Sequence, residues 1–225
     1  MDLTHLLNAS AATVVIGGTV LATVLRAGIS DCRITFSALV RLARPAFHAE
    51  RVRADLAGQV AQIRQDGVLR ARFSHTGDAE FDEATDALIR TRSLPALIER
   101  HEAHRRRRAA TAAAAARTLY QAADLGPVFG LAGTLVSLSQ LPAEGVARAA
   151  LTGAISMAVL TTLYGLLMAN LLCAPLARAV ERQAEMEERA RQEVIDWLSW
   201  QLAPALPLHE PVMPVVAREV AERAA

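Results

Sequence analysis

The chain has 225 residues, with 24 basic and 23 acidic side chains, so no chain-wide positive field marks it as a nucleic-acid binder. Hydrophobic residues make up 52% of the chain but aromatic residues only 4%, and the mean hydropathy is +0.24, which excludes a disordered chain. Two cysteines, Cys32 and Cys173, are too few for a disulfide scaffold.

Three stretches lack Arg, Asp and Glu: residues 3–25, 125–143 and 149–177, which are 23, 19 and 29 residues long. A helix needs about 20 mostly apolar residues to cross about 30 Å of hydrocarbon. We therefore predict a first transmembrane helix over 6–26 and a transmembrane hairpin over 123–177 that turns at 144–148. A signal peptide is the alternative for the first stretch, but its start lacks the basic residues of such peptides.

All 24 basic residues are arginines, and their distribution predicts the orientation in the membrane. Seventeen lie between Arg26 and Arg117, one is Arg148 in the hairpin turn, and six follow from Arg178 onward. Because cytoplasmic loops are enriched in Lys and Arg, we expect the N-terminus outside and the C-terminus inside. Residues 27–122 and 178–203 are then cytoplasmic, and we expect a multi-pass protein of a bacterial inner membrane.

The cytoplasmic residues show helical spacing and no strand alternation. Apolar residues recur at helical spacing in two sets: Val52, Leu56, Val60 and Ile63, then Phe81, Ala84 and Leu88. The first set predicts a helix that ends near Gly67. One long helix should run from Ser93 to Leu141, past Pro127, and another over 149–202, past Pro175, about 80 Å long. Prolines then predict a flexible tail over 204–225. The expected fold is an all-α membrane protein.

Two cytoplasmic motifs have simpler explanations than a binding site. Arg105 to Arg108 form a basic run that we interpret as a solvated helix face rather than a nucleic-acid patch. His101 and His104 do not have the spacing of a zinc-protease motif, so we predict no metal. The sequence also lacks a nucleophile constellation and a phosphate-binding loop. We therefore expect neither an enzyme nor a bound cofactor.

Small residues line one face of each hairpin helix. They are Gly126, Gly130 and Gly133 in the second span, and Ala158, Thr162, Gly165 and Ala169 in the third. Such faces let membrane helices approach closely, and we take them to predict a homo-oligomer. Four hydroxyls accompany them and are candidates for a polar path: Thr134, Ser137, Thr161 and Thr162. Since proton paths normally use an ionisable relay and no span carries a charge, the carboxylate would come from another chain.

These motifs resemble a known family. Residues 124–138 read Asp-Leu-Gly-Pro-Val-Phe-Gly-Leu-Ala-Gly-Thr-Leu-Val-Ser-Leu, which is similar to the Pro-x-x-Gly-x-x-Gly-Thr signature of the MotA/TolQ/ExbB proton channel family. Residues 157–176 look like the last membrane helix of its MotA branch, through Thr-Leu-Tyr-Gly and Ala-Asn-Leu…Pro-Leu. Residues 17–23 resemble the second MotA span, and 81–123 its cytoplasmic helices. Flagellar MotA has four spans, so three spans with the N-terminus outside match ExbB and TolQ.

The resemblance implies a mechanism. In this family a pentamer surrounds two copies of a single-span partner of the MotB or ExbD type, whose Asp carries the ion. Thr134 and Thr162 match threonines that face this Asp. Pro127 and Pro175 match prolines that shape the hairpin ends and couple ion passage to cytoplasmic motion. The ion is expected to be H⁺, although the pair Thr161 and Thr162 adds oxygen ligands that would suit Na⁺.

Three functions are compatible with the sequence. The first is an ion-conducting stator subunit that converts proton- or sodium-motive force into mechanical work. The second is a non-conducting membrane scaffold or assembly protein that uses the same packing faces. The third is a soluble helical bundle whose apolar stretches form its core. A neighbouring gene for a single-span protein with a buried Asp favours the first, and membrane fractionation separates the third.

Overall fold

The computed structural model describes residues 8–44, 47–66, 76–141 and 148–205, and the regular structure in these ranges is helical. The predictions for Gly67, for the hairpin turn over 144–147 and for the tail beyond residue 205 lie outside the described residues. The chain divides into two compact units. Unit 1 comprises residues 1–46 and 107–187, and unit 2 comprises residues 47–106 and 188–225.

Three described helices are long and apolar enough to cross a membrane: Ala9–Leu42, Leu94–Ser139 and Arg148–Leu202. The predicted all-α architecture with three spans is therefore confirmed in these residues. The second of them, α5 (Leu94–Ser139), is a single helix of 46 residues with Pro127 inside it, which confirms that one long helix continues past Pro127. Both α5 and the last of these helices contribute residues to each unit.

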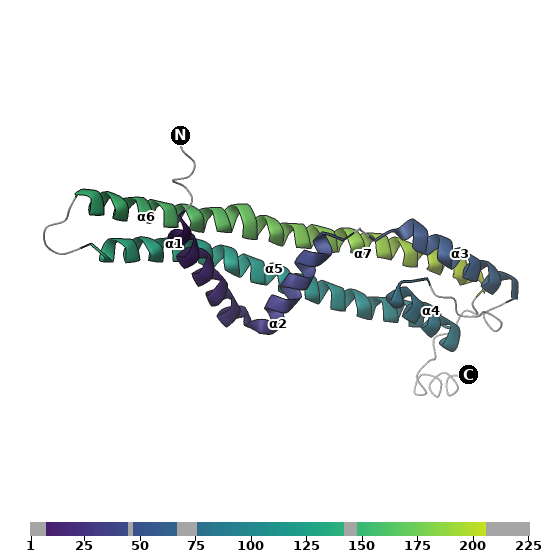
Figure 1. Cartoon of the computed structure of the whole chain (residues 1–225). Coiled ribbons are helices and arrows are strands. Elements are labelled where there is room, and N and C mark those ends of the chain that lie inside the picture. Colours follow the sequence, from purple (N-terminus) through teal and green to yellow (C-terminus); the bar gives the residue numbers. More distant parts are fainter. Residues whose placement is uncertain (1–7, 45–46, 67–75, 142–147, 206–225) are drawn as a thin grey trace, which may run out of the picture. The chain divides into compact units, whose positions relative to one another are not determined.

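The first span contains two departures from a regular helix. It comprises α1 (Ala9–Ala12), a π-helical segment η2 (Thr13–Gly17) and α2 (Gly18–Leu42). The side chain of Asn8 caps its start by accepting from the backbone N–H groups of Ser10 and Ala11. At Gly28 the backbone has φ 84° and ψ 160°, a combination that essentially only glycine adopts. The helix axis changes direction there (Figure 1), two residues beyond the predicted span of 6–26.

The last helix is continuous over 55 residues, but it is not a uniform α-helix. It consists of α6 (Arg148–Leu167), the π-helical segment η3 (Met168–Cys173) and α7 (Ala174–Leu202). Pro175 follows η3 and lacks the N–H that a regular helix uses. The ring of a proline also meets the carbonyl four residues earlier, which here belongs to Leu171 inside the wider turn of η3, and the helix continues past Pro175.

Unit 2 has an apolar core built by four helices. The helices α3 (Ala49–Asp66) and α4 (Ala79–Thr91) pack with the beginning of α5 and the end of α7. The core contains Val52, Leu56, Val60 and Ile63 from α3, Phe81, Ala84 and Leu88 from α4, Leu97 from α5, and Val194, Ile195, Leu198 and Leu202 from α7. Both predicted apolar sets are therefore buried, which confirms that these two segments are helices that face a common core.

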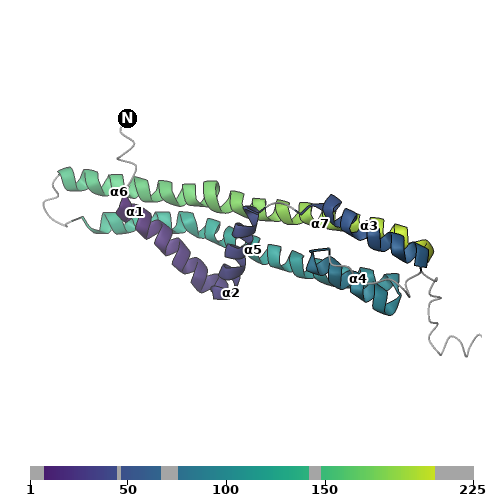
Figure 2. The same ribbon diagram turned by 45° about the vertical axis from the view of Figure 1, so that its right-hand side comes forward.

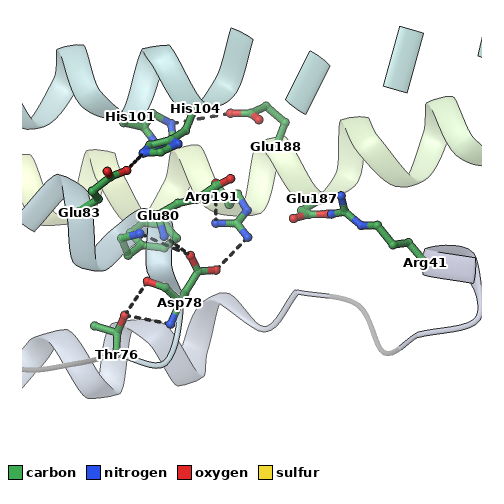
Figure 3. A network of polar contacts seen from close by, with 11 residues as sticks. Arg41, Thr76, Asp78, Glu80, Glu83, His101, His104, Glu187, Glu188 and Arg191 are labelled. Carbon is green, nitrogen blue, oxygen red and sulfur yellow. Dashed lines mark hydrogen bonds and ion pairs between the residues drawn. The ribbon is translucent and has the colours of Figure 1, made fainter. Parts of the chain in front are cut away.

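A buried arginine joins α7 to the start of α4 in unit 2. Arg191, only 8% exposed, lies 2.8 Å from Asp78 Oδ2 and 3.4 Å from Glu80 Oε2 (Figure 3). Its guanidinium also lies 4.4 Å from the centroid of the Phe47 ring, a favourable cation–π contact that covers the charge on one side. Asp78 at the same time caps α4 by accepting from the N–H groups of residues 80 and 81. The ion pairs of Arg191 with Asp78 and Glu80 thus fix the N-terminus of α4.

The two histidines singled out in the sequence lie next to carboxylates in unit 2. His104 Nε2 lies 2.6 Å from Glu83 Oε2, and His101 Nε2 lies 3.7 Å from Glu188 Oε1 (Figure 3). His101 is also 6% exposed, beneath the ring of Phe81 at 6.5 Å. Both side chains therefore tie α5 to neighbouring helices.

Candidate functional site

The helices α5 and α6 run side by side in unit 1 (Figure 1 and Figure 2) and touch through their glycines. A Cβ atom at Gly165 would lie 2.5 Å from the carbonyl oxygen of Gly126, and one at Gly126 would lie 2.8 Å from the carbonyl oxygen of Gly165. A Cβ atom at Gly130 would lie 3.1 Å from the carbonyl oxygen of Thr161. The backbones are so close that these positions have no room for a side chain.

The two predicted small-residue faces pack against each other within one chain. Gly126 lies against Ala169, and Gly133 lies under the side chain of Thr161, whose Cβ and Cγ2 would be 2.8 Å from an added Cβ. Ala158 lies half-buried on the same helix. These contacts correct one inference from the sequence: the small faces are used by the hairpin itself, so they do not indicate an oligomer.

All four predicted path hydroxyls donate to carbonyl oxygens of their own helix. The bonds run from Thr134 to Leu131 at 2.6 Å, from Ser137 to Thr134 at 2.8 Å, and from Thr161 and Thr162 to Ala158 at 3.0 and 3.1 Å. A hydroxyl whose proton is used in this way keeps its lone pairs as acceptors. Each oxygen therefore keeps lone pairs as acceptors, but only an accessible oxygen can offer them to a proton donor or a cation from outside the chain.

Exposure separates these hydroxyls into two kinds. Thr161 is fully buried and Ser137 is 6% exposed, whereas Thr134 and Thr162 are half-buried. The Cα atom of Thr162 lies next to Gly130, and Thr134 is one turn further along α5, about 6 Å along the axis. Thr134 and Thr162 thus lie at the edge of the hairpin, where a group outside the chain can reach them. Thr161, which the sequence offers as an additional oxygen ligand beside Thr162, is fully buried and lies against Gly133.

The prolines have different surroundings. Pro127 lies inside α5 directly after Gly126, at the closest approach of the two helices. Its missing N–H leaves a carbonyl one turn earlier without its helical donor. Pro175 lies at the start of α7, directly after η3. Both are placed where the backbone hydrogen-bond ladder of a hairpin helix is interrupted.

The first span packs onto this hairpin. The backbone N–H of Asn8 donates to the Tyr164 hydroxyl at 3.0 Å, which ties the start of α1 to α6. Gly18 of α2 lies directly against the ring of Phe129 on α5 and has no room for a side chain. Sequence inspection missed these anchors, although glycine pairs in a membrane helix are a general signal of close contact.

Polar pairs join the helices of unit 1 beyond the charge-free stretches. The Tyr120 hydroxyl donates to Glu181 at 3.0 Å, and this hydrogen bond, with burial and the Glu181 charge, raises the pKa of Tyr120 against the opposing effect of Arg178. Arg41 pairs with Glu187 at 3.1 Å (Figure 3). These pairs connect α5 and α2 to α7 and have no signature in the sequence, because their partners are 61 and 146 residues apart.

Three long apolar helices, two of which cross at glycines beside uncharged hydroxyl side chains, are typical of a helical membrane protein with several spans. Residues 61–193 match the MotA/TolQ/ExbB proton channel family, and the chain belongs to this family. The resemblance of the hairpin motifs is thereby confirmed. The family places the protein in a membrane, in agreement with its three apolar helices.

Several relatives carry motility names. The chain is 25% identical over 164 residues to Motility protein A of Cereibacter sphaeroides, covering 72% of this chain and 65% of that protein. It is 30% identical over 116 residues to the uncharacterized protein YtxD of Bacillus subtilis, covering 52% and 39%. The matched segments thus span less than two thirds of these relatives.

Two solved structures share the fold. The flagellar MotAB stator complex from Bacillus subtilis superposes with a TM-score of 0.78 at 19% identity, over 100% of this chain and 91% of that one. MotAB of C. jejuni superposes with a TM-score of 0.74 at 16% identity, over 95% and 90%. At these identities the likeness establishes the fold.

Proposed function

We propose that the chain is an ion-conducting subunit of a stator-like complex that couples proton-motive force, or sodium-motive force, to mechanical work. A single-span partner of the MotB or ExbD type supplies the ion-carrying Asp. The observation that carries the proposal is the pair of acceptor oxygens on Thr134 and Thr162, at the open edge of a charge-free hairpin. Family membership and the MotAB fold support it.

The geometry suits a protonated carboxyl group from outside the chain. Because both hydroxyl protons are used within the helix, the oxygens accept rather than donate, and they stabilise a neutral carboxyl O–H or a bound cation. A bare carboxylate receives no such donor until a hydroxyl rotates away from its carbonyl. The site therefore binds the loaded partner better than the unloaded one, a difference that ties ion release to movement.

The energy scale fits transport rather than catalysis. One charge that crosses the membrane delivers about 2.3 kcal/mol per 100 mV. This amount is enough for a stepwise rotation or a pull on a partner. We accordingly propose no enzymatic reaction and no bound cofactor for this chain.

The proposed assembly is a homo-oligomer, a pentamer around two partner copies, in a bacterial inner membrane. Apolar side chains next to the hairpin edge are strongly exposed in the single chain, among them Leu131, Leu135 and Val159 at 58%, 70% and 62%. Such surfaces fit lipid or neighbouring subunits. The arginine distribution supports the N-terminus outside and the C-terminus inside.

The test is ion flux through the purified complex of this chain with its co-expressed single-span partner, reconstituted in vesicles. Thr162→Val keeps the shape of the side chain and removes the acceptor oxygen. We expect it to slow flux at least about tenfold, which corresponds to about 1.4 kcal/mol at the barrier, with expression and oligomer size unchanged. Thr134→Val should act in the same direction but less completely.

Thr152→Val is the matched control. Thr152 lies on the same helix, is exposed, and its hydroxyl makes the same kind of bond to the carbonyl of Arg148, at 2.9 Å. It lies far from the glycine crossing, so its loss should leave flux unchanged. Wild-type flux in a well-folded Thr162→Val complex, or no flux in the wild-type complex, would favour the non-conducting scaffold.

A further inference from the structure

Asn170 is an exposed carboxamide inside the longest charge-free stretch of the chain. Its Nδ2 donates to the carbonyl oxygen of Leu166 at 3.0 Å, and this is the only hydrogen bond of the Asn170 side chain to the described residues. The stretch 149–177 is centred near residue 163, so Asn170 lies about 10 Å from the midpoint, within hydrocarbon depth. The acceptor Oδ1 is thus presented at a depth where contact with lipid is unfavourable.

The burial of its neighbours indicates which way Asn170 faces. Buried positions recur every four residues along the helix: Thr161, Gly165, Ala169 and Cys173. In a regular α-helix twelve residues turn the side chain about 120° away from the starting direction. A π-turn spreads one turn over more residues, and the Ala174 N–H indeed donates to the Ala169 carbonyl, five residues back. The wider turn helps to keep these four buried residues on the same face of the helix.

A second line runs parallel to the buried one. Thr162, Leu166 and Asn170 each follow directly after a buried residue of that line, and they are half-buried or exposed. In a regular α-helix, Asn170 would be rotated about 80° from the direction of Thr162, and the wider turns of η3, which begins at Met168, reduce this rotation. Asn170 follows the buried Ala169 as Thr162 follows the buried Thr161, so it lies on the same edge of the hairpin, two turns or about 12 Å nearer to α7.

We propose that Asn170 is a further ion-path residue, whose Oδ1 accepts a hydrated monovalent cation, H₃O⁺ or Na⁺, after it has passed Thr162. This assignment rests on the proposed ion-conducting function. The separation of about 12 Å is too long for one side chain to serve both positions. Leu166 lies between them and offers no polar atom of its own side chain. Water therefore bridges the two oxygens, and Asn170 holds the lower end of this water column.

Cysteine accessibility tests the location in water directly and does not require conduction. In a Cys32→Ser, Cys173→Ala background, Asn170→Cys is treated with a charged, water-soluble thiol reagent in the assembled complex. Leu172→Cys is the control, since Leu172 is 56% exposed at nearly the same depth but points to another side of the helix. We expect Asn170→Cys to react at least about tenfold faster, because only a hydrated thiol ionises.

Two accessibility outcomes overturn the proposal. Equal, slow modification of both cysteines would place Asn170 against lipid. Efficient disulfide formation between copies of Asn170→Cys, with no modification, would place it at a subunit interface. Both outcomes leave the proposed ion conduction standing, so a failure of this inference is distinguishable from a failure of the proposed function.

Flux measurements then test the role of the oxygen. In vesicles with an imposed potential, we expect Asn170→Leu to lower proton or ²²Na⁺ flux at least about tenfold, and Asn170→Gln, which keeps the carboxamide, to retain most of it. Leu171→Ala is the neutral neighbour. Wild-type flux in Asn170→Leu would refute the assignment, whereas absence of flux in the wild-type complex would refute the proposed function itself.

Discussion

The substitution Gly165→Ala tests whether the hairpin depends on backbone contact. The added Cβ would lie 2.5 Å from the carbonyl oxygen of Gly126 and 3.1 Å from the Cα of Gly130, and both atoms are backbone, so no side chain can move aside. Because ordinary van der Waals contact begins at 3.4 Å, the two helices would have to move apart by about 0.9 Å to accept the new Cβ.

A separation of this size weakens the whole crossing. A gap of about 0.5–1 Å loses a quarter to a half of the dispersion energy of each contact, and overpacking of a tight contact typically costs about 1–3 kcal/mol. Alanine has a higher helix propensity than glycine by about 1 kcal/mol, and this gain offsets part of the destabilisation. Gly153→Ala on the same helix receives this gain without a clash, because nothing lies within 4 Å of its added Cβ.

The two alanine variants should therefore differ by about 1–3 kcal/mol in the free energy of unfolding, with Gly165→Ala the less stable. The buried thiol of Cys173 reports the opening of the hairpin in SDS titrations when Cys32 is replaced by Ser. We expect labelling of Cys173 at a lower SDS fraction in Gly165→Ala than in Gly153→Ala. Equal midpoints would show that the helices do not touch through these glycines, and would refute the argument for the crossing.

Four further predictions follow from named contacts. Arg191→Met should destabilise unit 2 by about 3 kcal/mol, because it leaves Asp78 and Glu80 without their cation; urea unfolding monitored by Trp197 fluorescence, with the exposed Arg182→Met as control, measures this loss. Gly28→Ala should destabilise the first span by about 1–3 kcal/mol, because alanine is strained at the backbone angles of Gly28. A clash does not contribute, since the nearest atom to an added Cβ is Ser30 Oγ at 3.9 Å, and an SDS midpoint equal to that of Gly17→Ala would contradict the strain. The raised pKa of Tyr120 means that the contribution of its hydrogen bond to stability is present at neutral pH and is lost as pH rises through that pKa, so wild type and Tyr120→Phe should converge in stability at high pH. Ala143→Cys should react with an impermeant reagent in intact cells, and labelling only after lysis would reverse the proposed orientation.

Charge and spacing in the sequence were enough to predict the number and type of the main helices. The charge-free stretches coincide with three long apolar helices, and the uninterrupted pattern after Ser93 corresponds to the single helix α5. The two apolar sets of unit 2 are buried because helical periodicity directly encodes which side faces a core. The Gly and Thr pattern of the second span likewise identified the family, since it is continuous in the chain.

Local geometry and pairing between distant residues were not predictable in this way. The π-turn in η3 depends on how the helix accommodates Pro175 while it packs on α5, and no residue type specifies it. The kink falls at Gly28 rather than at Gly17 or Gly18, although all three residues are identical in kind. Such choices depend on which neighbours the backbone meets.

The sequence by itself determined that the chain forms apolar helices with a small, hydroxyl-bearing face, because composition and period are local properties. Only the tertiary structure decided what that face does. In the tertiary structure, Gly126, Gly130 and Gly165 form the contact inside the hairpin. Thr161 is buried there, whereas Thr134 and Thr162 lie at the edge. Adjacent hydroxyls in one helix point about 100° apart, so the partner helix alone selects which of them is buried and which remains open to a second chain.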